Sequence, residues 1–164
     1  LNAFLVAGFI EELFKFLVLH LYCARKSDFD EPMDAVVYSV VVSLGFACLE
    51  NVLYVMSGGM LIAALRAVTA VPVHASLGAL MGYYYAKQRF GSPGHARLWS
   101  KALWVPVLVH GLYDLFPFIL SSGLFEAEAR PLLVLALVVA SLFLMGWLFM
   151  RARTIALELR SQQF

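Results

Sequence analysis

Long apolar runs constrain the fold of this sequence more than any other feature. About 20 apolar residues in a helix cross the hydrocarbon core of a bilayer, because a helix rises about 1.5 Å per residue. Five such runs can be marked, at residues 2–23, 33–57, 60–86, 100–121 and 131–150. Each is predicted to be a helix, since lipid offers no hydrogen bonds to an exposed backbone. The sequence therefore predicts an all-α, polytopic transmembrane bundle of about five helices.

The composition agrees with a membrane-embedded chain. Apolar residues make up 62% of the 164 residues and charged residues only 14%, against about 25% charged residues in an ordinary soluble domain. We expect one membrane-embedded domain, residues 1–164. The net charge of +1 gives no reason to expect a nucleic-acid partner. Residue 1 already lies in an apolar run, so we expect this domain to be the core of a longer chain.

Prolines and basic residues predict the shape and orientation of the helices. Pro32 and Pro131 suit the first turn of the second and fifth helices, whereas Pro72 and Pro106 should kink the third and fourth. With alternating crossings, one face receives Arg25, Lys26, Lys87, Arg89, Arg97, Lys101, Arg151, Arg153 and Arg160. The other face receives Arg130 only. The first face is therefore predicted to be cytosolic.

Ionisable residues interrupt four of the runs, where each costs a few kcal/mol unless it is paired or hydrated. They are Glu11, Glu12 and Lys15 in the first predicted helix, Glu50 beside Asn51 in the second, Arg66 and His74 in the third, and His110 and Asp114 in the fourth. Counted from the ends of the spans, Glu11, Glu50, His74 and His110 all fall near the midplane or in the outer half. Four helices thus present polar groups at overlapping depth, which predicts a buried polar centre.

Spacing within two of the helices predicts specific contacts. Glu11 and Lys15 are four residues apart and share a helix face, so we expect the lysine to hold that carboxylate ionised. Glu50 and Tyr54 have the same spacing, so the phenol is placed to donate to the carboxylate. Taken singly, the first pair could be a structural bridge and Glu50 could make a helix–helix hydrogen bond.

The third and fourth helices carry two further patterns. His110 and Asp114 are four residues apart, so the carboxylate could orient the imidazole or bind the same ion. His74, Gly78 and Gly82 form one stripe, whose small residues let another helix approach closely. We therefore expect His74 to be brought against partners on a neighbouring helix.

Three classes of chemistry suit such a centre. Histidines and carboxylates are the ligands of hydrolytic zinc sites, which keep one position for water. Without a metal, a glutamate could activate water while His and Asn side chains support the oxyanion. A membrane transporter or proton-coupled channel is the remaining alternative, because buried histidines and acids also form proton relays.

Four motifs follow one another along about residues 8–115. They are EELFK with Glu11, Glu12 and Lys15, FACLENVLY with Phe46, Glu50, Asn51 and Tyr54, RAVTAVPVHASLGALMGY with Arg66, Pro72 and His74, and HGLYD with His110 and Asp114. Together they resemble the motifs of the PrsW family of intramembrane metalloproteases, which is related to the CAAX prenyl endopeptidases and bacteriocin-processing proteins. The fifth helix adds no motif.

The resemblance implies a protease domain in a bacterial or archaeal cell membrane. It implies hydrolysis of a peptide bond in a membrane-spanning or membrane-tethered protein. In the best-known branch this is the first, extracytosolic-side cut in an anti-sigma factor. Glu11 or Glu12 is then expected to activate the water, and the sequence does not separate the two.

The remaining polar residues take roles around that water. We expect Glu50, His74 and His110 to surround a zinc ion or the water itself, with Asp114 as fourth ligand or orienting group. The motif around Glu50 reads FxxxE where the CAAX relatives have FxxxH, and Asp114 takes a position that is often Asn. Supporting roles are expected for Lys15, Asn51, Tyr54 and Arg66.

Overall fold

The computed structural model describes residues 8–91, 98–121 and 130–161. Its elements in chain order are α1 (Glu12–Leu21), the short 3₁₀ turn η2 (Cys23–Arg25), α2 (Pro32–Val68), α3 (Ala70–Phe90), α4 (Leu98–Ser121) and α5 (Arg130–Ser161). No strand occurs among the described residues. The predicted all-α fold of five helices is therefore confirmed.

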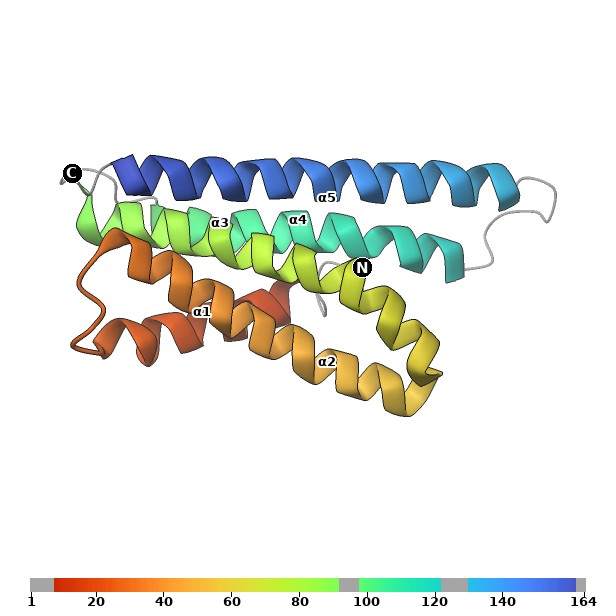
Figure 1. Ribbon diagram of the computed structural model, residues 1–164, viewed down its shortest axis with the longest axis horizontal. Helices are drawn as coiled ribbons and strands as arrows, with labels where there is room; N and C mark the ends of the chain where they lie inside the picture. The colour runs from red at the N-terminus through yellow and green to blue at the C-terminus, as the bar shows by residue number, and fades with distance from the viewer. Residues whose placement is uncertain (1–7, 92–97, 122–129, 162–164) are drawn as a thin grey trace.

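α2 is a helical hairpin rather than a straight rod. Gly59 has φ 82° and ψ 173°, a backbone region that is essentially restricted to glycine, and the chain turns back there (Figure 1). Residues 60–68, called the arm below, continue as a short helix. A second break follows at Thr69, three residues before Pro72. Pro72 would clash with the carbonyl of residue 68 in a continuous helix, so the break falls upstream of the proline.

The other prolines behave more simply. Pro32 is the first residue of α2, where a capping box also forms: the Glu31 backbone N–H donates to the Asp34 carboxylate at 2.8 Å. Pro131 is the second residue of α5, as predicted. α4 continues without interruption through Pro106, where the sequence predicts a kink.

Close packing of α2 on α3 joins two of the helices that carry the polar residues. A Cβ atom added at Gly78 would lie 2.7 Å from Ser43 Oγ, and one added at Gly82 would lie 2.5 Å from the Ala35 carbonyl oxygen. Only a hydrogen fits at either position, as the predicted small-residue stripe requires. α3 also contacts α4 and α5, so it is the central helix of the bundle.

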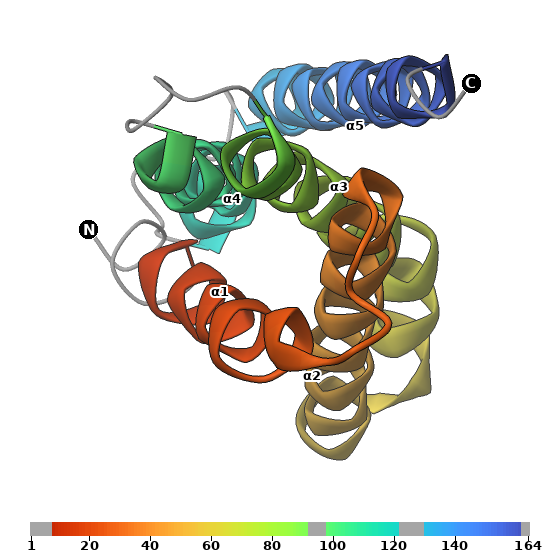
Figure 2. The same cartoon turned by 90° about the vertical axis from the view of Figure 1, so that its left-hand side faces the viewer.

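The helices alternate in direction (Figure 1). The end of α1, the start of α2, the end of α3 and the end of α5 lie at one end of the bundle, shown on the left. Viewed from that end, α1 to α4 form a ring, and α5 lies outside it beside α3 and α4 (Figure 2). The segments predicted to carry the basic loops therefore gather at one end.

Large apolar side chains cover much of the outer surface. Met56, Leu61, Leu132 and Phe143 are between 74% and 80% exposed, and extended apolar surfaces of this kind mark contact with membrane or protein. Among the described helices, α2 alone is long and apolar enough to span a bilayer by length and composition. The single domain over residues 1–164 stays a prediction.

Candidate functional site

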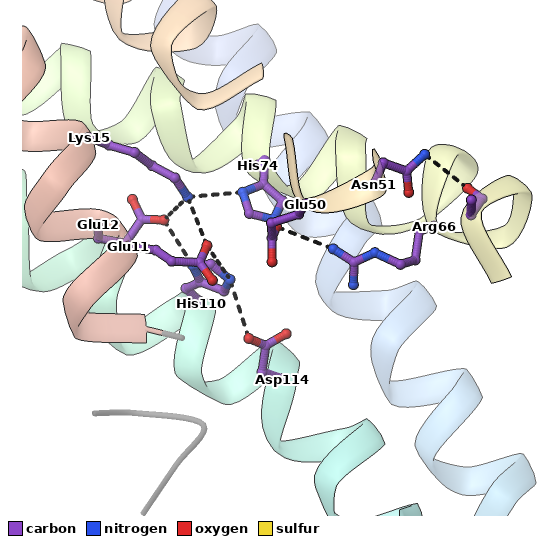
Figure 3. Close-up of polar contacts among 10 residues, drawn as sticks. Glu11, Glu12, Lys15, Glu50, Asn51, Arg66, His74, His110 and Asp114 are labelled. Atoms are coloured by element: carbon purple, nitrogen blue, oxygen red, sulfur yellow. Dashed lines mark hydrogen bonds and ion pairs between the residues drawn. The ribbon is translucent and has the colours of Figure 1, made fainter. Parts of the chain in front are cut away.

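Three charged side chains at the start of the first helix point into the ring of helices (Figure 3). Residues 8–11 form a wider π-helical turn that leads into α1, a feature that is frequent at functional sites. Glu11 lies in this turn, and Glu12 and Lys15 follow it, both fully buried. Lys15 Nζ lies 2.6 Å from Glu12 Oε1 but 3.6 Å from Glu11 Oε2. Lys15 therefore pairs chiefly with Glu12 rather than with the predicted Glu11, which belongs to the wider turn.

Two histidines from α3 and α4 face the same space. The rings of His74 and His110 are nearly perpendicular, with centroids 4.9 Å apart. His110 Nδ1 lies 2.8 Å from Glu12 Oε1, and His74 Nδ1 lies 2.9 Å from Lys15 Nζ. The first helix thus contacts each ring at Nδ1 and leaves both Nε2 atoms for other partners.

Carboxylates from two other helices take those Nε2 positions. His74 Nε2 lies 3.0 Å from Glu50 Oε2, and His110 Nε2 lies 3.3 Å from Asp114 Oδ2. Asp114 is therefore beside His110, where its spacing places it. Both carboxylates are partly exposed, whereas both imidazoles are nearly fully buried. The centre is thus enclosed on the side of α1 and open on the side of Glu50 and Asp114.

The α2 hairpin adds a second layer around Glu50. Arg66, on the arm, places a terminal nitrogen 3.2 Å from Glu50 Oε2. Its guanidinium lies over the Tyr54 ring, 3.8 Å from the centroid, so Tyr54 supports Arg66 instead of donating to Glu50 as predicted. Asn51 Nδ2 donates to the Ala63 carbonyl at 3.2 Å. Asn51 therefore ties the arm to the first half of α2.

Three of these residues could hold a metal ion. Glu11, His74 and His110 each offer a ligand atom, and these atoms lie within 4.8 Å of one another. Two histidines and a carboxylate, with a position left for water, make a catalytic zinc set. The predicted set contains Glu50 in place of Glu11. In the structure Glu50 contacts both His74 at 3.0 Å and Arg66 at 3.2 Å, and Glu11 completes the cluster with the two histidines.

One further neighbour of the centre was not given a role by the sequence. The Phe46 ring lies with its centroid 5.7 Å from Lys15 Nζ, within reach of a cation–π interaction. Phe46 stands four residues before Glu50 in α2. That i,i+4 spacing is the signal that could have identified it.

Comparison with known proteins gives one consistent answer. The chain matches the family described as "PrsW family intramembrane metalloprotease" over residues 1–147. It is 42% identical to Protease PrsW of Geobacillus kaustophilus over 114 residues, and this match covers 69% of this chain and 50% of that protein. It is 40% identical over 124 residues to Protease PrsW of Bacillus subtilis, covering 75% and 57%. No solved structure matches the chain.

A third relative extends the coverage. Protease PrsW of Oceanobacillus iheyensis is 36% identical over 141 residues, covering 85% of this chain and 64% of that protein. The chain thus spans between 50% and 64% of the length of these three relatives. All three are bacterial, and none supports the archaeal alternative. The chain belongs to the PrsW family of intramembrane metalloproteases.

Proposed function

We propose that this chain is the catalytic part of an endopeptidase that hydrolyses a peptide bond of a membrane-spanning or membrane-tethered protein. The observation that carries the proposal is the environment of Glu11. Its Oε2 atom is buried and has no hydrogen-bond partner among the described residues; Lys15 Nζ lies 3.6 Å and His110 Nε2 4.0 Å from it. A buried carboxylate oxygen needs a donor, and the water consumed in hydrolysis is a suitable one.

Glu11 is the glutamate that removes the proton from this water. Glu12 Oε2 also lacks a hydrogen-bond partner among the described residues. Glu12 is nevertheless less suited to that role, because its side chain is fully buried where that of Glu11 is partly exposed, and its Oε1 already accepts from Lys15 and His110 at 2.6 and 2.8 Å. Taking a further proton there would disrupt both contacts. Glu12 instead orients His110 from behind, as carboxylates orient the histidines of catalytic and metal sites. A positioned general base contributes about 10²–10⁴ to the rate.

The open side of the centre is where the peptide approaches. Glu50 and Asp114 border it and are partly exposed, with side-chain exposures of 24% and 19%. Asp114 steadies the His110 ring from this side, and Arg66 steadies Glu50. The peptide therefore meets the water between α2 and α4.

We propose zinc as the metal ion of this centre. Its ligands would be drawn from Glu11, His74 and His110, whose ligand atoms lie within 4.8 Å of one another, and His110 fits best because Glu12 supports its Nδ1. A Glu11 carboxylate bound to zinc would be a ligand, so the role of Glu11 as base belongs to the route without a metal. When bound, zinc polarises the peptide carbonyl and lowers the pKa of a bound water. A metal-free route would use Glu11 alone to activate the water.

The substrate follows from where the centre lies. A buried polar centre surrounded by apolar helices meets peptide segments that enter from the bilayer. The family resemblance favours the first cut in a membrane-spanning anti-sigma factor, and we propose this class of substrate.

The test uses the chain in proteoliposomes with a membrane-anchored reporter peptide. Glu11→Gln is expected to reduce cleavage by about 10²-fold or more, and His110→Ala to reduce it as well. Asp28→Asn is the matched control, because Asp28 is an exposed acid that accepts a hydrogen bond from Ser27. Chelator treatment followed by added zinc tests the metal.

Two results would contradict the proposal. The first is unchanged cleavage by Glu11→Gln, Glu12→Gln and His110→Ala proteins that are folded and inserted. The second is movement of solute or protons across the vesicle membrane without cleavage, which would favour the transporter alternative.

A further inference from the structure

Lys15 can only donate hydrogen bonds to the polar groups around it. Its ammonium has three hydrogens to donate and no lone pair to offer. Its neighbours are Glu12 Oε1 at 2.6 Å, His74 Nδ1 at 2.9 Å and Glu11 Oε2 at 3.6 Å. Lys15 itself is completely buried. His74 Nδ1 therefore accepts a hydrogen from Lys15.

This contact decides which nitrogen of His74 carries the ring hydrogen. In a neutral imidazole one nitrogen accepts and the other donates. With Nδ1 accepting from Lys15, the hydrogen lies on Nε2. The carboxylate of Glu50 stands 3.0 Å from Nε2 and receives it. Lys15 thus donates to His74 and His74 donates to Glu50, in one chain of hydrogen bonds that runs from α1 through α3 to α2 (Figure 3).

His110 is held in the opposite sense. The group at its Nδ1 is the Glu12 carboxylate at 2.8 Å, which can only accept. His110 therefore donates from Nδ1 to Glu12, and its Nε2 faces a second acceptor, the Asp114 carboxylate, at 3.3 Å. The two histidines, whose ring centroids lie 4.9 Å apart, thus differ at Nδ1, where His74 accepts from Lys15 and His110 donates to Glu12.

We propose that Lys15 is a positioning residue that fixes His74 as a hydrogen-bond donor at Nε2, so that His74 supports the oxyanion of peptide hydrolysis and lies outside the metal ligand set. This inference rests on the proposed function. Arg66 also holds Glu50 at 3.2 Å, so the carboxylate keeps a partner when His74 donates to the oxyanion instead. A donor aimed at developing charge is worth about 10²–10³ in rate.

The first experiment reads the ring hydrogens directly. The chain has four histidines, so ¹⁵N-histidine labelling with long-range ¹H–¹⁵N correlation spectra resolves each ring, and single His→Asn variants assign them. We expect Nδ1 of His74 to be unprotonated and Nδ1 of His110 to be protonated. Lys15→Arg, which keeps a donor, should preserve this pattern, whereas Lys15→Met, which has no hydrogen to donate, should let the His74 hydrogen appear on Nδ1. A protonated Nδ1 on His74 in the unsubstituted protein would overturn the inference.

The second experiment uses cleavage of the reporter peptide. Glutamine keeps an N–H donor, so His74→Gln should retain at least tenfold more activity than His74→Ala. The same exchange at His110 should give no such rescue, because the ring bridges Glu12 at Nδ1 and Asp114 at Nε2, and one amide cannot replace both contacts. Zinc binding, measured by titration calorimetry with ZnCl₂, should weaken about 10-fold or more in His110→Ala and little in His74→Gln. Equal loss of activity in both His74 variants, or loss of zinc binding in His74→Gln, overturns the role assigned to His74.

The two experiments together separate this inference from the proposed function. If the unsubstituted chain cleaves no reporter, the proposed function fails, and the spectra still decide how Lys15 sets His74. If it cleaves and the spectra show both rings in the same state, the proposed function stands and the role of Lys15 is overturned.

Discussion

Glu12 and Lys15 form an ion pair from which water is excluded. Removing one member of a buried pair leaves the other charge uncompensated, at a cost of about 3–5 kcal/mol. Glu12→Gln is therefore expected to lower the free energy of unfolding by about that amount. Glu11 is partly exposed and lies 3.6 Å from Lys15, so Glu11→Gln should cost less than about 1 kcal/mol.

Denaturant unfolding in detergent, followed by circular dichroism, measures both variants. The comparison also distinguishes the two adjacent glutamates, because loss of activity without loss of stability is expected of Glu11 only. Equal destabilisation by both substitutions would show that Lys15 is shared between them.

The contact of Tyr54 with Arg66 gives a second prediction at this scale. The ring, and not the phenol, touches the guanidinium, so Tyr54→Phe should leave cleavage of the reporter unchanged. Tyr54→Ala removes a cation–π contact of about 0.5–1 kcal/mol and should raise KM modestly through the loosened Arg66. A large loss of cleavage in Tyr54→Phe would instead support the predicted hydrogen bond from the phenol to Glu50.

Residue types and depth could be predicted from the sequence, whereas the choice of partners could not. An intramembrane charge is costly, so Glu11, Glu50, His74 and His110 were marked by their position in apolar runs. Whether Lys15 turns to Glu11 or Glu12 depends on a π turn, which no residue pattern signals. The contact of Tyr54 depends on the arm folding back over α2.

The α2–α3 contact brings His74 within reach of Glu50, and its closeness depends on two glycines. Gly82→Ala places a methyl group 2.5 Å from the Ala35 carbonyl oxygen, and overpacking of this kind costs about 1–3 kcal/mol. Gly45→Ala is the control, because a Cβ atom there meets nothing within 4 Å and alanine favours the helix. In thermal unfolding, Gly82→Ala should lower the melting temperature and Gly45→Ala should raise it slightly, each compared with the unsubstituted protein. A stable Gly82→Ala protein with unchanged activity would show that the helices can separate without loss.

Helix boundaries could be predicted where a glycine pair or a proline marks them directly. The structure breaks the helix at the Gly58–Gly59 pair, as the sequence predicts. It also begins α2 at Pro32 and α5 one residue before Pro131. The break at Thr69 was missed, because the clash of Pro72 acts one turn upstream of the proline itself. α4 passes Pro106 unbroken, so a proline alone does not fix where a helix ends.

At the scale of the whole molecule, alternating helix directions place the η2–α2 loop and the tip of the α2 hairpin at opposite ends of the bundle (Figure 1). The basic residues predict that the first of these is cytosolic. Single-cysteine proteins test this, built in a background that lacks Cys23 and Cys48. Asp28→Cys reports on the loop and Ser57→Cys on the hairpin tip.

A membrane-impermeant maleimide should label Ser57→Cys in intact cells and Asp28→Cys only in inverted vesicles. The reason is that basic loops are retained on the cytosolic side, while the hairpin tip carries no basic residue between Asn51 and Leu65 to hold it there. Labelling of both positions from one side would mean that α2 does not cross the bilayer. The reverse pattern would keep the crossing but invert the orientation, so that the open side bordered by Glu50 and Asp114 would face the opposite half of the membrane.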